Sequence, residues 1–345
     1  MNKIINQIVP IKKNKDINLG ISILRVILSF MVVLDHLYNK KKLKKYLYIL
    51  YYHIPTFFLI SFYFTYKTLT SFNIYKIKLR FERILIPYFS WCTISWILNN
   101  FYFYLLRKKC RHSIKDFFIN LLNGHIFLVP LWFQYILNLL TLIFLIVIFS
   151  FKNKFIYVLH ILSFIALILQ YSGYNYSFFK DNFKKDSYLT LGRFAETFPN
   201  AVIGFSLAKY DIISIIKNNR NISFYFLIIL IIITRYDIFS ELKTFKYGGI
   251  RLNIAAICIF ILFSVFPFKK ITNKILINGI IIITKYTAGI YFTHVLFGKG
   301  YLCNLLKIVK KGTLLGCIFI YIISYFGSFI GTKILGKTKF RHLFA

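Results

Sequence analysis

The amino-acid sequence predicts an all-α polytopic membrane protein, a bundle of about ten transmembrane helices in which residues 1–345 form one domain. The chain is 58% hydrophobic, and its mean hydropathy is +0.65. Its 40 Phe and 26 Tyr residues lie in apolar runs long enough to cross a bilayer. The 45 Lys and Arg residues against 10 Asp and Glu give a net charge of +35, but the aromatic runs exclude a disordered or nucleic-acid-binding tail.

Ten apolar runs account for the predicted spans, each near the ~20 residues that a crossing helix needs. The first, Leu19 to Tyr38, follows a basic tail. It is not a signal peptide, because it is as long as a full span, contains ionisable residues and is followed by no small-residue cleavage site. The other runs are 47–66, 84–106, 131–151, 155–172, 194–209, 222–236, 252–268, 280–298 and 313–334. The run 194–209 is the weakest, because it is short and contains Pro199 and Gly204.

The charges of the connecting segments do not orient the bundle. Alternate connections carry 21 and 22 Lys and Arg residues on the two sides, whereas cytoplasmic loops normally hold the excess. The basic loops therefore indicate affinity for anionic lipids or anionic ligands. The five cysteines are odd in number and form no CxxC pair, which predicts neither a disulfide framework nor a metal site.

The first span carries a polar stripe. At 100° per residue, Ser22, Arg25, Ser29 and His36 lie within about 60° of one another, and Arg25 and His36 are about 16.5 Å apart along the axis. An ionisable group in a span costs roughly 2.5–3.5 kcal/mol, so this stripe must face protein or water. Asp35 points about 100° away from His36, which places it poorly for a hydrogen bond to that ring but leaves it able to reach a neighbouring helix or to tune the charge of the site. Taken singly, Arg25 could extend to the headgroups and His36 could be a hydrogen-bonded helix end, but an imidazole can also accept a proton near neutral pH.

A second basic group precedes the run 84–106. Arg80 and Arg83 are i,i+3 neighbours, which is a phosphate-binding arrangement if the segment is helical. The alternative is ordinary anchoring at the membrane surface. Weaker signals are His53, His294 and Trp132, of which Trp132 is of a type common at membrane interfaces.

In this combination the residues resemble the acyltransferase 3 family of integral-membrane acyltransferases, in its stand-alone O-acetyltransferase type. The segments that carry the resemblance, in chain order, are Leu24-Arg25 with Asp35-His36, His53 to Ser61, Arg80-Phe81-Glu82-Arg83 with Pro87-Tyr88, Pro130 to Phe133, and Thr284 to His294. The chain departs from the family after Ser61, where Phe62 and Tyr63 replace the usual Gly and Tyr. This departure weakens the expectation of a close helix approach there.

The resemblance implies transfer of an acyl group, with acetyl expected, from a cytoplasmic acyl-CoA to a hydroxyl of a cell-envelope, capsular or O-antigen sugar. Arg80 and Arg83 would hold CoA phosphates, and Arg25 would meet the pyrophosphate or the pantetheine arm. His36 would be the general base. Asp35 would be catalytic together with His36. Asp35, His294 or His53 would orient His36 or stabilise its charged form, and we do not rank them; His53, Trp132 and His294 are the possible supporting residues.

The same resemblance defines the expected partners and location. Acetyl-CoA is a co-substrate, and neither a permanently bound cofactor nor a metal is expected. The partners are acyl-CoA, a sugar or lipid-linked glycan acceptor and membrane lipids, without nucleic acid. The protein is expected in the inner (plasma) membrane of a bacterium with its N-terminus in the cytoplasm. Acceptor contacts are expected in the longest polar connections, 107–130 and 173–193.

Two other functions remain open at this point. The main alternative is a polysaccharide flippase or polymerase that acts on a lipid-linked glycan, in which an intramembrane Arg would suit the pyrophosphate. The Arg-x-x-Arg pair and the Arg–His register argue against it. A transporter or a lipid-binding scaffold is a third possibility, for which the sequence has no visible inverted repeat or paired broken helices.

Overall fold

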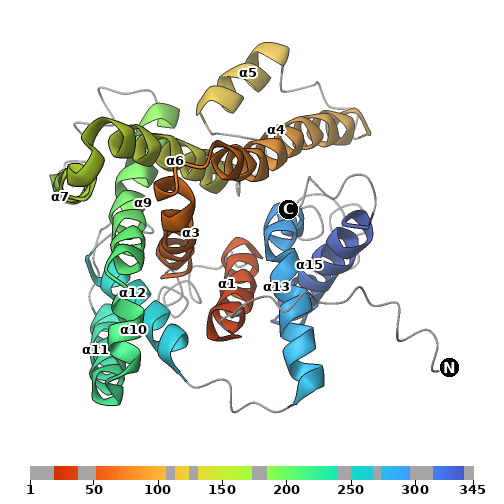
Figure 1. Cartoon of the computed structure of the whole chain (residues 1–345). Coiled ribbons are helices and arrows are strands. Elements are labelled where there is room, and N and C mark those ends of the chain that lie inside the picture. Colours follow the sequence, from red (N-terminus) through yellow and green to blue (C-terminus); the bar gives the residue numbers. More distant parts are fainter. Residues whose placement is uncertain are drawn as a thin grey trace, which may run out of the picture.

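The computed structural model is helical throughout the residues it describes, which are 19–37, 52–105, 113–123, 131–172, 185–239, 250–266, 273–295 and 314–337. Ten helices of 16 or more residues form the bundle in Figure 1. They are α1 (Leu19–Leu37), α3 (His53–Thr70), α4 (Ile74–Leu105), α6 (Leu131–Phe151), α7 (Phe155–Ser172), α9 (Lys185–Lys209), α11 (Arg220–Phe239), α12 (Ile250–Val265), α13 (Lys274–Val295) and α15 (Leu314–Leu335). The shorter elements are α5 (Ile114–Asn123), α10 (Ile212–Lys217) and the 3₁₀ turn η3 (Lys152–Lys154).

A helix lies at each of the ten predicted ranges, and the ranges 131–151 and 155–172 agree with α6 and α7 at both ends. The largest differences are at α4 and α9, because their polar first turns continue the helix toward its N-terminus. Within the described residues, two segments are long and apolar enough to cross a membrane, Leu131–Gln170 and Lys274–His294. Length and composition alone identify these two segments, so the crossing of the bilayer by all ten helices stays a prediction.

The outward faces of the long helices carry large apolar side chains. Phe164 of α7, Phe224 of α11 and Phe326 of α15 are each more than half exposed. Soluble monomers rarely expose extended apolar surface, so this outer surface is suited to contact with lipid. The long helices thus carry apolar residues both on the face that packs in the bundle and on the face that points outward.

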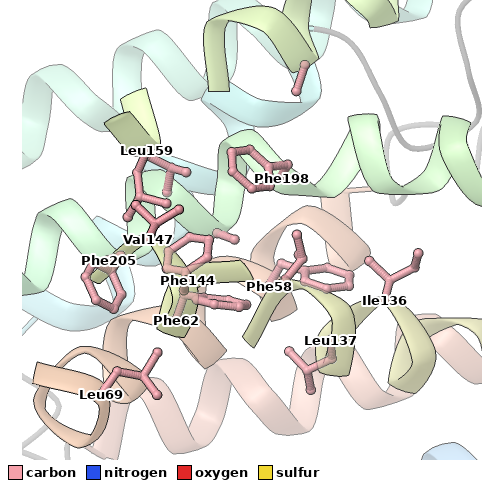
Figure 2. Close-up of a cluster of buried hydrophobic side chains, with 14 of the residues drawn as sticks. Phe58, Phe62, Leu69, Ile136, Leu137, Phe144, Val147, Leu159, Phe198 and Phe205 are labelled. Atoms are coloured by element: carbon pink, nitrogen blue, oxygen red, sulfur yellow. The ribbon is translucent and has the colours of Figure 1, made fainter. Parts of the chain in front are cut away.

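The largest buried cluster fills the space between α3, α6, α7 and α9 (Figure 2). Phe144 of α6 lies at its centre, with its ring centroid 4.5 Å from that of Phe62, 5.8 Å from Phe198 and 5.1 Å from Phe205. These four side chains are fully buried. Aromatic pairs at such distances contribute about 0.5–1.5 kcal/mol beyond the apolar area they bury.

A glycine on α9 permits a close approach to the backbone of α3. A Cβ placed on Gly204 would lie 2.2 Å from the carbonyl oxygen of Leu59, a backbone atom that cannot move independently. Phe62, which stands where the family usually has Gly, is instead buried against Phe144. The small residue that permits the close approach thus comes from α9.

We therefore expect Gly204→Ala to destabilise the bundle by about 1–3 kcal/mol, because the added methyl group forces the two backbones apart. Gly279→Ala is the matched control, since a Cβ at Gly279 would meet nothing within 4 Å. The control should be neutral or stabilising, because alanine favours the helix interior. Thermal unfolding of the two purified variants in the same detergent measures the difference, and equal midpoints would contradict the close approach.

Pro199 in the middle of α9 is accommodated by a side chain of α7. Proline has no N–H to donate to the carbonyl four residues earlier, which here is that of Ala195. The Gln170 side chain donates its Nε2 hydrogen to this carbonyl, and both groups are buried. The predicted weak range 194–209 is therefore part of a continuous 25-residue helix.

This arrangement predicts a coupling between Gln170 and Pro199. Gln170→Leu should cost about 1–3 kcal/mol, because it leaves the buried Ala195 carbonyl without its donor. In a Pro199→Ala background the backbone N–H at position 199 can donate to Ala195, so the same change should cost much less. A double-mutant cycle of unfolding free energies tests the pair, and additive effects would exclude the coupling.

Candidate active site

The polar stripe of α1 faces α13 and α15. The Arg25 Nη2 donates a hydrogen bond of 3.1 Å to the Thr287 hydroxyl, and one turn earlier the Thr284 hydroxyl donates to the Ser22 carbonyl at 3.1 Å. Ser29 Oγ lies 3.0 Å from the hydroxyl of Tyr325, which belongs to α15. The predicted stripe is thus covered by protein, and Arg25 reaches sideways to α13.

These contacts also define the direction of each helix. Ser22 pairs with Thr284 and Arg25 with Thr287, so α1 and α13 are parallel. The Ser324 hydroxyl of α15 donates to the His294 carbonyl, whereas Thr332 lies against Gly289, so α15 runs in the opposite direction. The C-terminal ends of α1 and α13 therefore lie side by side.

Ionisable and aromatic groups meet at these C-terminal ends, which we call the reaction end. The charge of Asp35 on α1 is close enough to act on Tyr291 and His294 of α13. His294 is fully buried, and its Nδ1 lies 3.1 Å from the Ile290 carbonyl. The charge of Asp35 thus acts on the neighbouring helix α13.

Arg193 of α9 adds a cation to the reaction end. Its guanidinium carbon lies 4.4 Å from the ring centre of Trp132 on α6, and its charge acts on Tyr291. Trp132 is only 4% exposed, so it packs inside the bundle and not against lipid. Phe133 follows it and packs against Tyr291 with ring centroids 5.3 Å apart.

The two remaining predicted histidines are positioned by their helices. His53 is buried at the first residue of α3, one turn before Phe57, whose ring centroid lies 6.1 Å from that of Phe133. His36 belongs to the last turn of α1, next to Asp35, and its side chain lies outside the described residues. Its role as a base therefore stays a prediction.

A separate basic cavity of about 280 Å³ lies where the C-terminal half of α3 meets the first turns of α4. Arg80, Arg83 and Lys76 line it from α4, and Thr65 and Thr68 from α3. Arg80 donates a 2.8 Å hydrogen bond from Nη2 to the Ser61 hydroxyl. We call this cavity the basic pocket.

The electrostatics of the basic pocket favour an anion. Arg80 precedes the apolar part of α4; its Nε is buried, and the described residues supply no hydrogen-bond partner for it. Burial, and secondarily the charge of Arg83, lowers the Arg80 pKa to about 10, which leaves the guanidinium protonated at neutral pH. Three cations beside two hydroxyl groups form a site suited to phosphate oxygens.

The basic pocket and Arg25 lie on the same side of the reaction end. Phe57, near the start of α3, is linked through the Phe133 ring to Tyr291 at the C-terminal end of α13. Arg80 is bonded to Ser61, about one turn farther along α3, and the pocket residues Thr65 and Thr68 lie farther still from Phe57. The structure thus separates a cationic side from the reaction end along the bundle axis.

The family model described as an acyltransferase domain, acyltransferase 3, matches residues 18–333. The chain belongs to the acyltransferase 3 family. It is thus a membrane acyltransferase. Searches of curated proteins and of solved structures found no match.

The five segments that carry the resemblance to the acyltransferase 3 family come together in the fold. Arg25 binds Thr287, so the first segment contacts the last. Arg80 binds Ser61, so the third segment contacts the second. Phe133 of the fourth segment packs against Tyr291 of the fifth and Phe57 of the second. Segments separated by up to 262 residues thus form one connected set.

Sequence reasoning missed three residues of this candidate site. Arg193 was counted among the charges of a connecting loop, and only the helical start of α9 brings it onto Trp132. Tyr325 and Ser324 lie in an apolar span without any local signal. In the described part of the chain, no group of three His, Cys, Asp or Glu side chains is arranged to hold a metal ion.

Proposed function

We propose that this membrane acyltransferase moves an acetyl group from acetyl-CoA to a hydroxyl of a cell-envelope sugar. The observation that carries the proposal is the basic pocket, with its buried arginine nitrogen directed at no protein acceptor in the described residues. Its three cations suit the phosphates of CoA, and they lie on the same side of the reaction end as Arg25.

In this proposal the donor spans the two sites. The phosphates occupy the basic pocket, Arg25 meets the pyrophosphate or the pantetheine arm, and the thioester reaches the reaction end. The axial distance between Arg25 and His36, about 16.5 Å, suits an extended pantetheine arm. The basic pocket then faces the cytoplasm, which places the N-terminus on the same side and the acceptor on the other.

The chemistry uses one base. His36 accepts the proton of the acceptor hydroxyl while its oxygen attacks the thioester carbonyl. The new C–O bond forms, the C–S bond breaks, and the CoA thiolate takes up the proton as it leaves. Asp35 stabilises the imidazolium by charge, and His294 and His53 support the site from α13 and α3.

Arg193 fits this scheme as a residue that stabilises the developing oxyanion. Its guanidinium carbon lies 4.4 Å from the Trp132 ring centre, a cation–π contact that restrains the side chain. A fixed cation next to a reacting carbonyl lowers the barrier more than a mobile one, because little reorganisation is needed. Trp132 supports the chemistry through this contact.

The donor site can be tested with two exposed cations of α4. Arg83→Ala should weaken acetyl-CoA binding about tenfold or more, because it removes a charge-assisted hydrogen bond. Lys78→Ala is the control, since Lys78 is exposed, pairs with Glu82 at 3.8 Å and does not line the pocket. Calorimetric titration of the detergent-solubilised protein with acetyl-CoA measures both, and equal losses would remove the pocket from the donor site.

The reaction itself is tested by transfer of labelled acetyl from acetyl-CoA to envelope glycan in membranes that contain the protein. Base-labile label should appear with the wild type and fall at least 100-fold with His36→Ala, the range expected for loss of a general base. Transfer by both proteins would support the acyltransferase activity but would contradict the assignment of His36 as the base. Transfer by neither, with other acyl-CoAs also inactive, would favour the flippase or polymerase alternative.

A further inference from the structure

A second cavity, of about 330 Å³, opens on the outer surface between α7, α9 and α10. Phe164 and Leu167 form its α7 wall, and Val202 and Ile203 form its α9 wall. Val202 is buried, whereas Phe164 is 64% exposed, so the groove has a closed floor and an open outer side. It shares no lining residue with the basic pocket.

The polarity of this groove changes along its length. The start of α7 lies beside the end of α9, because Phe155 packs against Phe205 with ring centroids 6.0 Å apart. Near this end the groove is lined by His160 and Ser206, whose Nε2 and Oγ atoms are 3.5 Å apart. Leu167 lies seven residues farther along α7, about 10 Å deeper, where the lining is apolar.

Lysines surround the polar mouth of the groove. The Lys209 Nζ lies 4.9 Å from the ring centre of Phe155 and 5.2 Å from that of Tyr210, which itself lines the groove. Lys152 and Lys154 of η3 are exposed and directly precede Phe155. The described residues close to this mouth thus include three cations and one acidic residue, Asp211, between the lining residues Tyr210 and Ile212.

We infer that this groove binds one anionic phospholipid, with an acyl chain between Phe164 and Val202 and the phosphate beside Lys209. The apolar part of the groove suits the acyl chain of such a lipid, and the cationic mouth suits its phosphate headgroup. The lysines favour an anionic over a zwitterionic headgroup. The site is independent of acyl transfer, because it uses none of the residues of the basic pocket or the reaction end.

Quenching of a tryptophan by brominated lipid chains tests the site. Phe164→Trp places the reporter in the groove, and Phe224→Trp, on α11, places one outside it at a matched exposure of 60% against 64%. Full-length protein is reconstituted into nanodiscs of non-brominated phosphatidylcholine with increasing fractions of brominated phosphatidylglycerol or brominated phosphatidylcholine. Wild-type protein in the same discs gives the background of the three native tryptophans.

We expect half-maximal quenching of the residue 164 reporter at about fivefold less brominated phosphatidylglycerol than brominated phosphatidylcholine. Lys209→Gln should remove this preference. Lys333→Gln should keep it, because Lys333 also lies over an aromatic ring, that of Phe329, but belongs to α15. Equal curves for the two lipids, equal curves for the two reporters, or the same loss with Lys333→Gln would each overturn the proposal.

Discussion

The rest of the structure depends on the need to cover the polar face of α1. A helix of Leu, Ile, Val and Phe that carries Arg25 and Asp35 cannot present these groups to hydrocarbon without a cost of several kcal/mol. The fold meets this requirement with two helices from the far end of the chain. Thr287 of α13 receives the hydrogen bond of Arg25, and Tyr325 of α15 covers Ser29. Helix α1 is thereby fixed in rotation, and this rotation determines where Asp35 and the last turn point.

Because α1 and α13 are parallel, the same pairing that covers Arg25 leaves the charge of Asp35 within electrostatic range of His294. One helix pair thus carries a hydrogen bond at the cationic side and an electrostatic interaction at the reaction end. The distance between the two is defined by the rise of a continuous helix, about 1.5 Å per residue, and not by loops. A separation fixed in this way does not vary when the connections change in length.

The ten helices could be predicted because each is marked by a local feature, a run of apolar residues of sufficient length. The helix ends at α4 and α9 were less predictable, because their basic first turns resemble loops in composition. The motifs around Arg25, Arg80 and His294 were also visible in the sequence. Their mutual contacts were not, since the Arg25–Thr287 bond joins positions 262 residues apart. The roles of Arg193 and Gly204 depend entirely on what a distant helix places against them, and no single segment encodes that.

A large residue on α3 and a small residue on α9 together shape the packing where the chain departs from the family pattern. Phe62 fills the aromatic cluster from α3, and Gly204 supplies the close approach from α9. Van der Waals packing drives helix association in lipid, so a glycine serves equally well on either helix of a pair. Either helix of the α3–α9 pair can therefore supply the glycine, and the sequence of α3 alone does not show which one does.

The Gln170–Ala195 hydrogen bond has a consequence for the outer surface. It ties α7 to α9 at one end of their contact, and the Phe155–Phe205 contact ties them at the other. Two helices joined at both ends cannot slide or splay between the joints without breaking one of them. The groove between α7 and α9 therefore has a fixed width before a lipid acyl chain enters it. A molecule that occupies this groove loses its own freedom of movement but orders no part of the protein, so its dwell time is governed by its own fit to the slot.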